Sequence, residues 1–240
     1  GSGKTSTLYA TLKQLATPEI NLCTLEDPIE MIEPAFNQMQ VQVNIDLTFA
    51  NGVRALLRQD PDIIMLGEIR DLETAEVAIQ AALTGHLVLS TLHTNDAPGA
   101  ISRLQELGVA PYLIKATLLG VMAQRLVRTL CPDCKTEHAP GPDEWQDFAP
   151  TWAGATPDTV CRAVGCAQCR ETGYNGRVGV YEVMAMSEKL RGLIGPETDL
   201  NAIRRQACAQ GMLTLRLAAA AKVAAGVTSL QEALRVTPHV

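Results

Sequence analysis

Gly1-Ser2-Gly3-Lys4-Thr5-Ser6 opens the chain, and its first five residues match the end of the phosphate-binding pattern G-x-x-x-x-G-K-[ST]. In that pattern glycine lets backbone N–H groups turn toward phosphate oxygens. The lysine adds positive charge near the β and γ oxygens, and the hydroxyl ligates Mg²⁺. A helix should follow, with Leu8, Leu12 and Leu15 on its apolar face. The stretch predicts a nucleotide-binding α/β core, and a glycine-rich helix start without a ligand is the alternative.

The first glycine of the pattern is absent, and so is the strand expected before it. We therefore expect a chain cut inside its own phosphate loop. Each lost charge-assisted hydrogen bond is worth about 1.5–3 kcal/mol, so ATP should bind more weakly to these residues than to an intact parent.

Apolar runs alternate with helical periodicity over the first half of the chain. Predicted strands are residues 22–25, 62–66 and 86–92, and predicted helices run from Asn51 to a stop at Pro61 and from Leu72 to an end at Gly85. Strands alternating with helices indicate an α/β fold with a mostly parallel sheet.

Ionisable side chains follow three of these strands. Glu26 is our candidate for the general base that activates water, with Asp27 and Glu30 near enough to share that role. Glu68 stands where a nucleotide hydrolase places an acid for Mg²⁺. His93 and His86, at the two ends of the strand over residues 86–92, could contact phosphate or sense its loss. The alternative for each acid is a solvated turn residue, and the alternative for a histidine is a packed or capping residue.

Composition bounds the class of protein. The chain has 240 residues, 47% of them apolar, and no uninterrupted apolar stretch reaches the roughly 18 residues of a membrane span. Its net charge of −6 and nine aromatic residues disfavour phosphate steering and base stacking, so we expect no nucleic-acid partner. No targeting sequence opens the chain, and a reducing cytoplasm is the expected compartment.

Two CxxC pairs separated by 31 residues predict a metal site. Four thiolates close a tetrahedral structural Zn²⁺ site, and a redox-active CxxC is the less favoured alternative. The expected ligands are Cys131, Cys134, Cys166 and Cys169.

The remaining cysteines are assigned no ligand role. Cys161 is read as a bystander that could compete as a ligand, and Cys23 and Cys208 as packed apolar residues.

The pattern changes after about residue 125. Residues 139–160 lack periodicity and indicate a loop-rich insert, and from Ser187 onward the pattern is helical, with Thr228 and Gln231 spaced as a capping box. We expect an ATPase core over 1–125, a zinc-binding tetracysteine subdomain over 126–180 and a small helical domain over 181–240.

Four motifs in order resemble those of secretion ATPases of the type II secretion and type IV pilus superfamily. They look like its Walker A, Asp box, Walker B and His box: Gly1–Thr5 with Thr7-Leu8-Tyr9, Leu25–Glu30, Leu57–Asp62 running to Gly67–Asp71, and Thr84–His86 through Ser90–Asn95. The resemblance continues through Gly173–Arg177 and Gly211-Met212 to Arg235–Thr237.

This resemblance implies a RecA-like P-loop fold and roles for five residues. Lys4 and Thr5 would meet the phosphates and Mg²⁺, Glu26 would activate water, Glu68 would lie on the metal side, and His93 would lie near the γ-phosphate. Arg54, Arg58 and Arg70 are possible phosphate or intersubunit contacts, with surface solvation the alternative.

The resemblance also implies a biological setting. The family's motors are hexameric rings that act in the cytoplasm, peripheral to the inner membrane through a platform protein, and its tetracysteine element marks assembly motors rather than retraction motors. The expected function is ATP hydrolysis that powers assembly of a type IV pilus or a type II secretion pseudopilus. A zinc-stabilised docking module with little nucleotide binding is the alternative.

Overall fold

A parallel sheet of four strands forms the N-terminal half of the computed structural model, which describes residues 1–141, 144–146, 148 and 156–238. The strand order is β2-β1-β3-β4, with every pair parallel. The strands are β1 (Leu22–Glu26), β2 (Asn37–Gln40), β3 (Ile63–Leu66) and β4 (Leu87–Ser90). The predicted strands and the parallel α/β class are confirmed.

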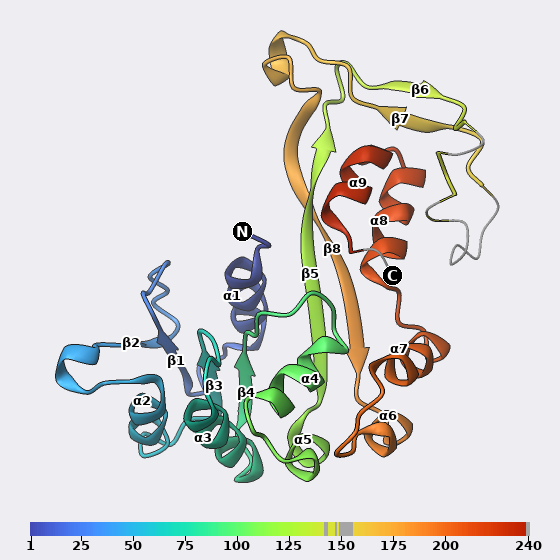
Figure 1. The fold of residues 1–240 in the computed structure, drawn as a ribbon. Helices are drawn as coiled ribbons and strands as arrows, with labels where there is room; N and C mark the ends of the chain where they lie inside the picture. The colour runs from blue at the N-terminus through green and yellow to red at the C-terminus, as the bar shows by residue number, and fades with distance from the viewer. Residues whose placement is uncertain (142–143, 147, 149–155, 239–240) are drawn as a thin grey trace.

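Helices cover both faces of this sheet (Figure 1). α1 (Lys4–Leu15) lies on one face, and α2 (Phe49–Leu56) and α3 (Leu72–Leu83) lie on the other. A short 3₁₀ turn η1 (Val43–Ile45) precedes α2, and α4 (Gly99–Glu106) and α5 (Pro111–Thr117) follow β4. The helix expected up to Pro61 ends earlier, at Leu56. Leu12 of α1 is buried and Leu8 packs against the same cluster, as expected, but Leu15 is more than a third exposed and Tyr9 is buried in addition.

Alternate residues of β1 and β3 pack against different helices. Leu25 and Ile64 lie against α2 and α3, whereas Leu22 and Met65 lie against α1. Because both faces are covered, every residue of β1 and β3 is buried, and β3 is a continuous apolar run rather than an alternating one. This packing fixes the edge from which the acidic residues project.

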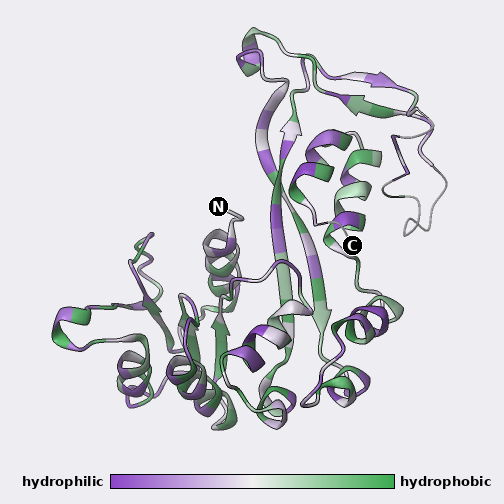
Figure 2. Ribbon diagram, viewed as in Figure 1, coloured by the Kyte–Doolittle hydropathy of each residue, from purple (hydrophilic) through white to green (hydrophobic). Residues whose placement is uncertain are grey.

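A long antiparallel ribbon leaves this core (Figure 1). It pairs β5 (Gly120–Leu130) with β8 (Tyr174–Ala185), and Figure 2 shows hydrophilic and hydrophobic residues mixed along it. One end carries the hairpin β6 (Thr136–His138) and β7 (Val160–Arg162) and the 3₁₀ turn η2 (Ala167–Cys169). Residues 125 and 180, the expected domain boundaries, lie inside these two strands.

Among the described residues that follow β8 there are four helices, as the pattern from Ser187 onward predicted. They are α6 (Glu188–Leu193), α7 (Leu200–Ala209), α8 (Leu215–Ala224) and α9 (Leu230–Val236), and the last two pack beside the ribbon.

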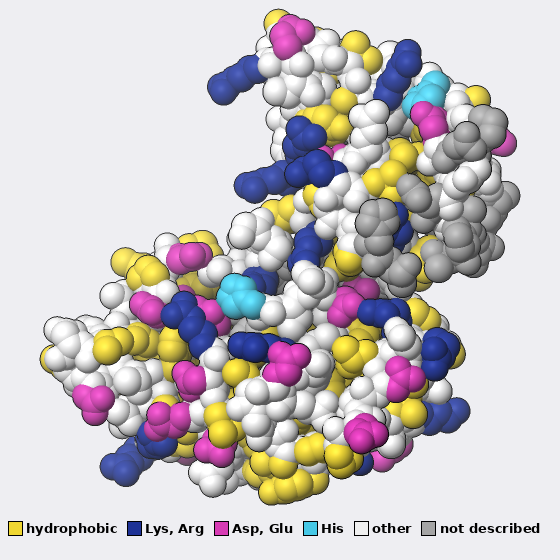
Figure 3. Space-filling model, viewed as in Figure 1, with side chains coloured by type: hydrophobic (Ala, Val, Ile, Leu, Met, Phe, Trp, Pro, Cys, Tyr) yellow, Lys and Arg dark blue, Asp and Glu magenta, His cyan; other side chains and the backbone are white. Residues whose placement is uncertain are grey.

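In the view of Figure 3, Lys and Arg side chains gather along one side of the ribbon half, and most acidic side chains lie over the core half.

Two local predictions were wrong. The capping side chain of α9 is Ser229, which accepts from the Glu232 N–H, whereas Thr228 donates to the Arg128 carbonyl. Cys208 is exposed rather than packed, because it lies on the solvent side of α7; Cys23 is buried as expected.

Part of the expected loop-rich insert, residues 142–143, 147 and 149–155, lies outside the described residues. Among the residues that the structure describes, no helix is long and apolar enough to cross a membrane.

Candidate nucleotide site and tetracysteine cluster

The parallel sheet brings three candidate residues to one edge. Glu26 ends β1, while Glu68 and His93 follow β3 and β4 closely. The Gly67 N–H donates to the Leu25 carbonyl at 2.8 Å, which continues the β1–β3 pairing to the sheet edge. Because carboxyl ends of parallel strands meet at one edge, this is the usual place for a ligand in an open α/β sheet.

Glu26 is buried, with 4% of its surface exposed, and neutral groups donate to it. The Tyr9 hydroxyl on α1 lies 2.9 and 2.8 Å from its two carboxylate oxygens, and the Thr24 hydroxyl lies 2.7 Å from Oε1. Gln38 adds a longer bond of 3.3 Å. Burial and the neighbouring carboxylate raise the pKa of Tyr9, so its hydroxyl remains a donor. The carboxyl group of Glu26 is thus hydrogen-bonded by uncharged side chains.

The two acids that could share the role of Glu26 lie differently. Asp27 and Glu30 are both exposed, on the turn that follows β1. Water reaches them from bulk solvent, whereas Glu26 is enclosed.

Glu68 and His93 are in contact. Nε2 of His93 lies 3.0 Å from Glu68 Oε2, and Arg70 pairs with Oε1 of the same carboxylate. The hydrogen bond from Arg70 is the main cause that holds the pKa of Glu68 below its ordinary value, and the bond with His93 adds to it. Glu68 is therefore ionised at neutral pH. Among the candidate arginines, Arg54 pairs with Glu73 on the surface instead.

His86 lies at the start of β4, the opposite end of the strand from His93. Its Nδ1 is 2.9 Å from the Ala81 carbonyl and 3.0 Å from the Thr84 hydroxyl, at the C-terminal end of α3. This histidine has the local capping role that was the alternative to a phosphate contact.

The start of α1 carries the other expected phosphate ligands. Gly3 is its N-cap, with a left-handed φ of 83°, and a Cβ there would lie 2.9 Å from Gln124 Nε2. The left-handed backbone favours glycine here, whereas the Gln124 side chain could move to admit a Cβ. The side chains of Lys4, Thr5 and Ser6 have no hydrogen-bond or ion-pair partner among the described residues.

Lys4 also lines a cavity of about 400 Å³ together with Ser90 and Thr91 of the neighbouring β4 region. A helix N-terminus with unused N–H groups, a free lysine and a free hydroxyl is a donor set that fits phosphate and Mg²⁺.

Four residues of this region were missed from the sequence. Thr24 could have been found, because it lies two positions before Glu26 and so shares its face of the strand. Tyr9 and Gln38 reach Glu26 from other elements, and Gln124 accepts from the Thr7 hydroxyl at 2.7 Å from 117 residues away. No local signal marks such contacts.

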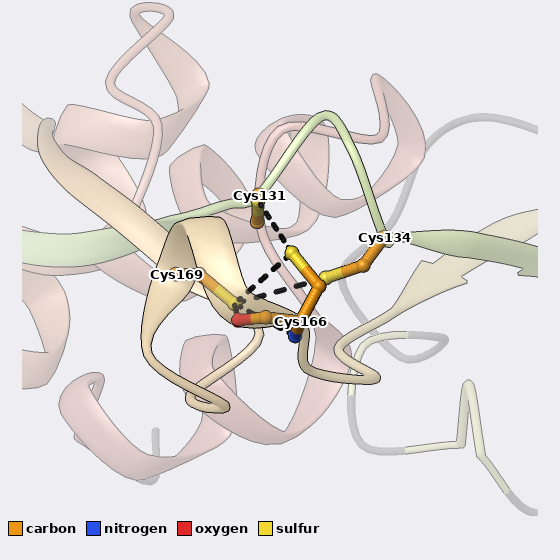
Figure 4. A group of neighbouring side chains, drawn as sticks. All are labelled: Cys131, Cys134, Cys166 and Cys169. Atoms are coloured by element: carbon orange, nitrogen blue, oxygen red, sulfur yellow. Dashed lines mark hydrogen bonds between the residues drawn. The ribbon is translucent and has the colours of Figure 1, made fainter.

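The four predicted zinc ligands meet at the far end of the ribbon (Figure 4). Their sulfur atoms lie within 4.8 Å of one another, with pairs at 4.0, 3.9 and 3.8 Å. Tetrahedral coordination with Zn–S bonds of about 2.3 Å requires S···S separations of about 3.8 Å. The cluster, formed by Cys131, Cys134, Cys166 and Cys169, therefore fits a zinc ion.

Backbone N–H groups favour the thiolate at Cys134 and Cys169 of this cluster, although burial still raises the pKa of Cys134. Gly165 donates to Cys134 at 3.3 Å, and Cys166 and Gly173 donate to Cys169 at 3.2 and 3.1 Å. Desolvation opposes the charge on Cys169, but these bonds outweigh it and lower its pKa to about 6. Cys161 is buried outside the cluster.

Comparison with known proteins gives relatives over nearly the whole chain. It is 59% identical over 238 residues to the type IV pilus assembly ATPase TfpB of Acinetobacter baylyi, and 48% identical over 237 residues to the type II secretion system ATPase E of Vibrio cholerae. These matches cover 99% of this chain but 41% and 46% of the relatives, so the chain spans less than half the length of either.

Solved structures share the fold. The pilus retraction motor PilT, solved with bound ADP, superposes with a TM-score of 0.70 at 27% identity and covers 99% of this chain and 59% of its own. The ATPase DotB of Legionella pneumophila gives 0.71 at 26% identity, covering 98% and 57%.

The family described as "Type II/IV secretion system protein" matches residues 1–235. Its secretion and pilus ATPases include the relatives above, and the predicted resemblance is confirmed. This chain belongs to that family.

Proposed function

We propose that this chain is the catalytic part of an ATPase that powers assembly of a type IV pilus or a type II secretion pseudopilus. The observation that carries the proposal is the meeting of Glu26, Glu68 and His93 at one edge of the sheet, on a core whose α1 begins with unused phosphate-binding groups. One relative is a type IV pilus assembly ATPase, which supports assembly of a filament as the process that ATP hydrolysis powers.

Each group at the edge has a role in this proposal. Residues Gly1–Ser6 bind the phosphates of ATP, with the Lys4 ammonium on the β and γ oxygens. The Thr5 hydroxyl and the Glu68 carboxylate hold Mg²⁺, which when bound neutralises charge on the phosphates. His93, already paired with Glu68, lies near the γ-phosphate.

Glu26 orients the attacking water and accepts its proton. Its enclosure by Tyr9, Thr24 and Gln38 fixes the carboxylate in one orientation. A positioned base of this kind contributes typically 10²- to 10⁴-fold to a rate. Because bulk water does not surround Glu26, the proton is received from one ordered water rather than from solvent.

The setting of the motor is also proposed. The fit of the cysteine cluster to zinc supports membership of the assembly type, since retraction motors are expected to lack the element. We propose a hexameric ring in the cytoplasm that reaches the inner membrane through a platform protein and binds no nucleic acid.

The test is Glu26→Gln in a full-length protein that carries this sequence. We expect ATP binding to be retained and turnover to fall at least 100-fold, measured by phosphate release and by nucleotide titration. Asp27→Asn is the matched control, because it removes an exposed carboxylate from the adjacent position. Loss of turnover in Asp27→Asn with activity retained in Glu26→Gln would move the role of base to Asp27.

One observation favours the alternative of a zinc-stabilised docking module with little nucleotide binding. The carboxylates of Glu26 and Glu68 are already hydrogen-bonded by protein groups. Titration calorimetry and phosphate release with MgATP, measured on a full-length protein that carries this sequence, separate the two: tight binding with turnover supports the ATPase, and absence of both supports the docking module.

A further inference from the structure

The segment of residues 91–98 between β4 and α4, here called the His93 loop, contacts the end of β3. The Thr91 hydroxyl donates to the Gly67 carbonyl at 2.7 Å, and His93 pairs with Glu68 at 3.0 Å. The His93 side chain is 73% exposed, so little packing fixes it. Its position depends on the backbone of the loop that carries it.

The other end of this loop is tied to the C-terminal half. Asp96 pairs through Oδ2 with Arg204 of α7 at 2.5 Å, and its Oδ1 accepts from the Gly99 N–H at 2.8 Å. Arg125 of β5 donates to the Asn95 carbonyl at 3.3 Å. Consecutive residues of the loop are thus held by separate elements.

A buried carboxylate makes the innermost tie. Glu182 of β8 is 2% exposed, and its Oε1 accepts from the Ala97 N–H at 2.7 Å. Its Oε2 accepts from the N–H of Leu215, the first residue of α8, at 3.1 Å. One side chain therefore joins the His93 loop, the ribbon and the start of a C-terminal helix.

We propose that Glu182 is a positioning residue: it holds the His93 loop in register with β8 and α8, and so sets where His93 stands relative to Glu68. The inference rests on the proposed ATPase function. Burying a carboxylate on two backbone N–H groups costs free energy that an apolar residue would not. Because the Glu182 carboxylate is bonded to both α8 and the His93 loop, a displacement of α8 would be passed to the loop that carries His93.

The test is a double-mutant cycle of Glu182→Gln and His93→Gln, with kcat for ATP measured in the full-length protein. We expect Glu182→Gln to lower kcat about 10-fold, within the range of about 2- to 30-fold known for coupling residues. If Glu182 acts through His93, the two losses do not multiply, and the double variant should have the same kcat as His93→Gln alone. A purely structural role gives losses that multiply, and that result overturns the inference.

Controls separate the possible failures. Glu188→Gln, which changes an exposed carboxylate on α6, should leave kcat unchanged. If Glu182→Gln does not fold, Arg204→Gln breaks the outer tie at a partly exposed position and enters the same cycle, with a smaller expected loss of about 2- to 5-fold. Absence of turnover in the unmodified protein sinks the proposed function, whereas normal turnover with multiplying losses sinks this inference alone.

Discussion

The sheet edge and the tetracysteine end are both built from residues distant in sequence, but they are held in different ways. At the sheet edge, Glu26 and Glu68 extend from strands whose residues are all buried, so packing and strand pairing fix them. At the tetracysteine end, the four cysteines lie on loops and on a 3₁₀ turn beside a short hairpin. The first arrangement should persist without its ligand, whereas the second should need a metal ion to keep its fold.

Zinc removal should have the largest effect. A structural zinc site contributes about 10–16 kcal/mol in small zinc-binding peptides, so Cys131→Ser should unfold the end of the ribbon. Hydrogen exchange should become fast around Cys131 and Cys166 and stay slow in β1 and β3. Elemental analysis should find one zinc per chain.

Cys208→Ser is the matched control, because this cysteine is exposed on α7 and outside the cluster. It should change neither zinc content nor exchange. A zinc content near zero in the unmodified protein, or loss of protection in β1 and β3 along with the ribbon, contradicts the comparison.

The same contrast explains what could be predicted from sequence. Strands β1, β3 and β4, the acids at the carboxyl ends of β1 and β3, and the paired CxxC motifs carry local patterns and were predicted, whereas β2 was not. The partners of those residues carry none: Tyr9 reaches Glu26 from α1, and Gln124 reaches Thr7 from β5. Such contacts arise from tertiary packing of segments that pair only after folding.

The ribbon itself was missed for a related reason. Residues 120–130 and 174–185 lie on either side of the insert, and their pairing, such as Arg128 opposite Arg177, is set by long-range register. Two arginines at facing positions disfavour pairing when the strands are considered alone. The buried Glu232 of α9 compensates by pairing with Arg128 at 2.8 Å.

Loss of charge at Glu232 should have an intermediate effect on the ribbon half. Burial alone would raise the pKa of Glu232, but hydrogen bonds from Arg235 and Arg128 outweigh it and lower the pKa from 4.5 to about 2. Because the folded pKa lies below the unfolded one, this stability is present above about pH 4.5 and is lost as pH falls through about 2. Because both arginines are partly exposed, we expect the charge of Glu232 to contribute about 2 kcal/mol to the free energy of unfolding.

Thermal unfolding of Glu232→Gln and the unmodified protein between pH 2 and pH 6 measures this loss as the difference between the two curves. Glu73→Gln is the control, since Glu73 pairs with Arg54 on the surface of the core and should contribute less than about 0.5 kcal/mol. A difference between Glu232→Gln and the unmodified protein that does not shrink toward pH 2 is the result against us.

The smallest effect is expected for Tyr9→Phe at the sheet edge. This change removes the hydroxyl that donates to Glu26 and accepts from Gln38 at 2.8 Å, but it keeps the ring packed against Phe36 at a centroid distance of 5.6 Å. Thr24 still donates to Glu26, so the carboxylate keeps a partner. We expect a loss of about 1–2 kcal/mol in chemical unfolding, with exchange in β1 and β3 unchanged. Loss of protection in both strands would mean that a single polar contact, rather than apolar packing, fixes this edge.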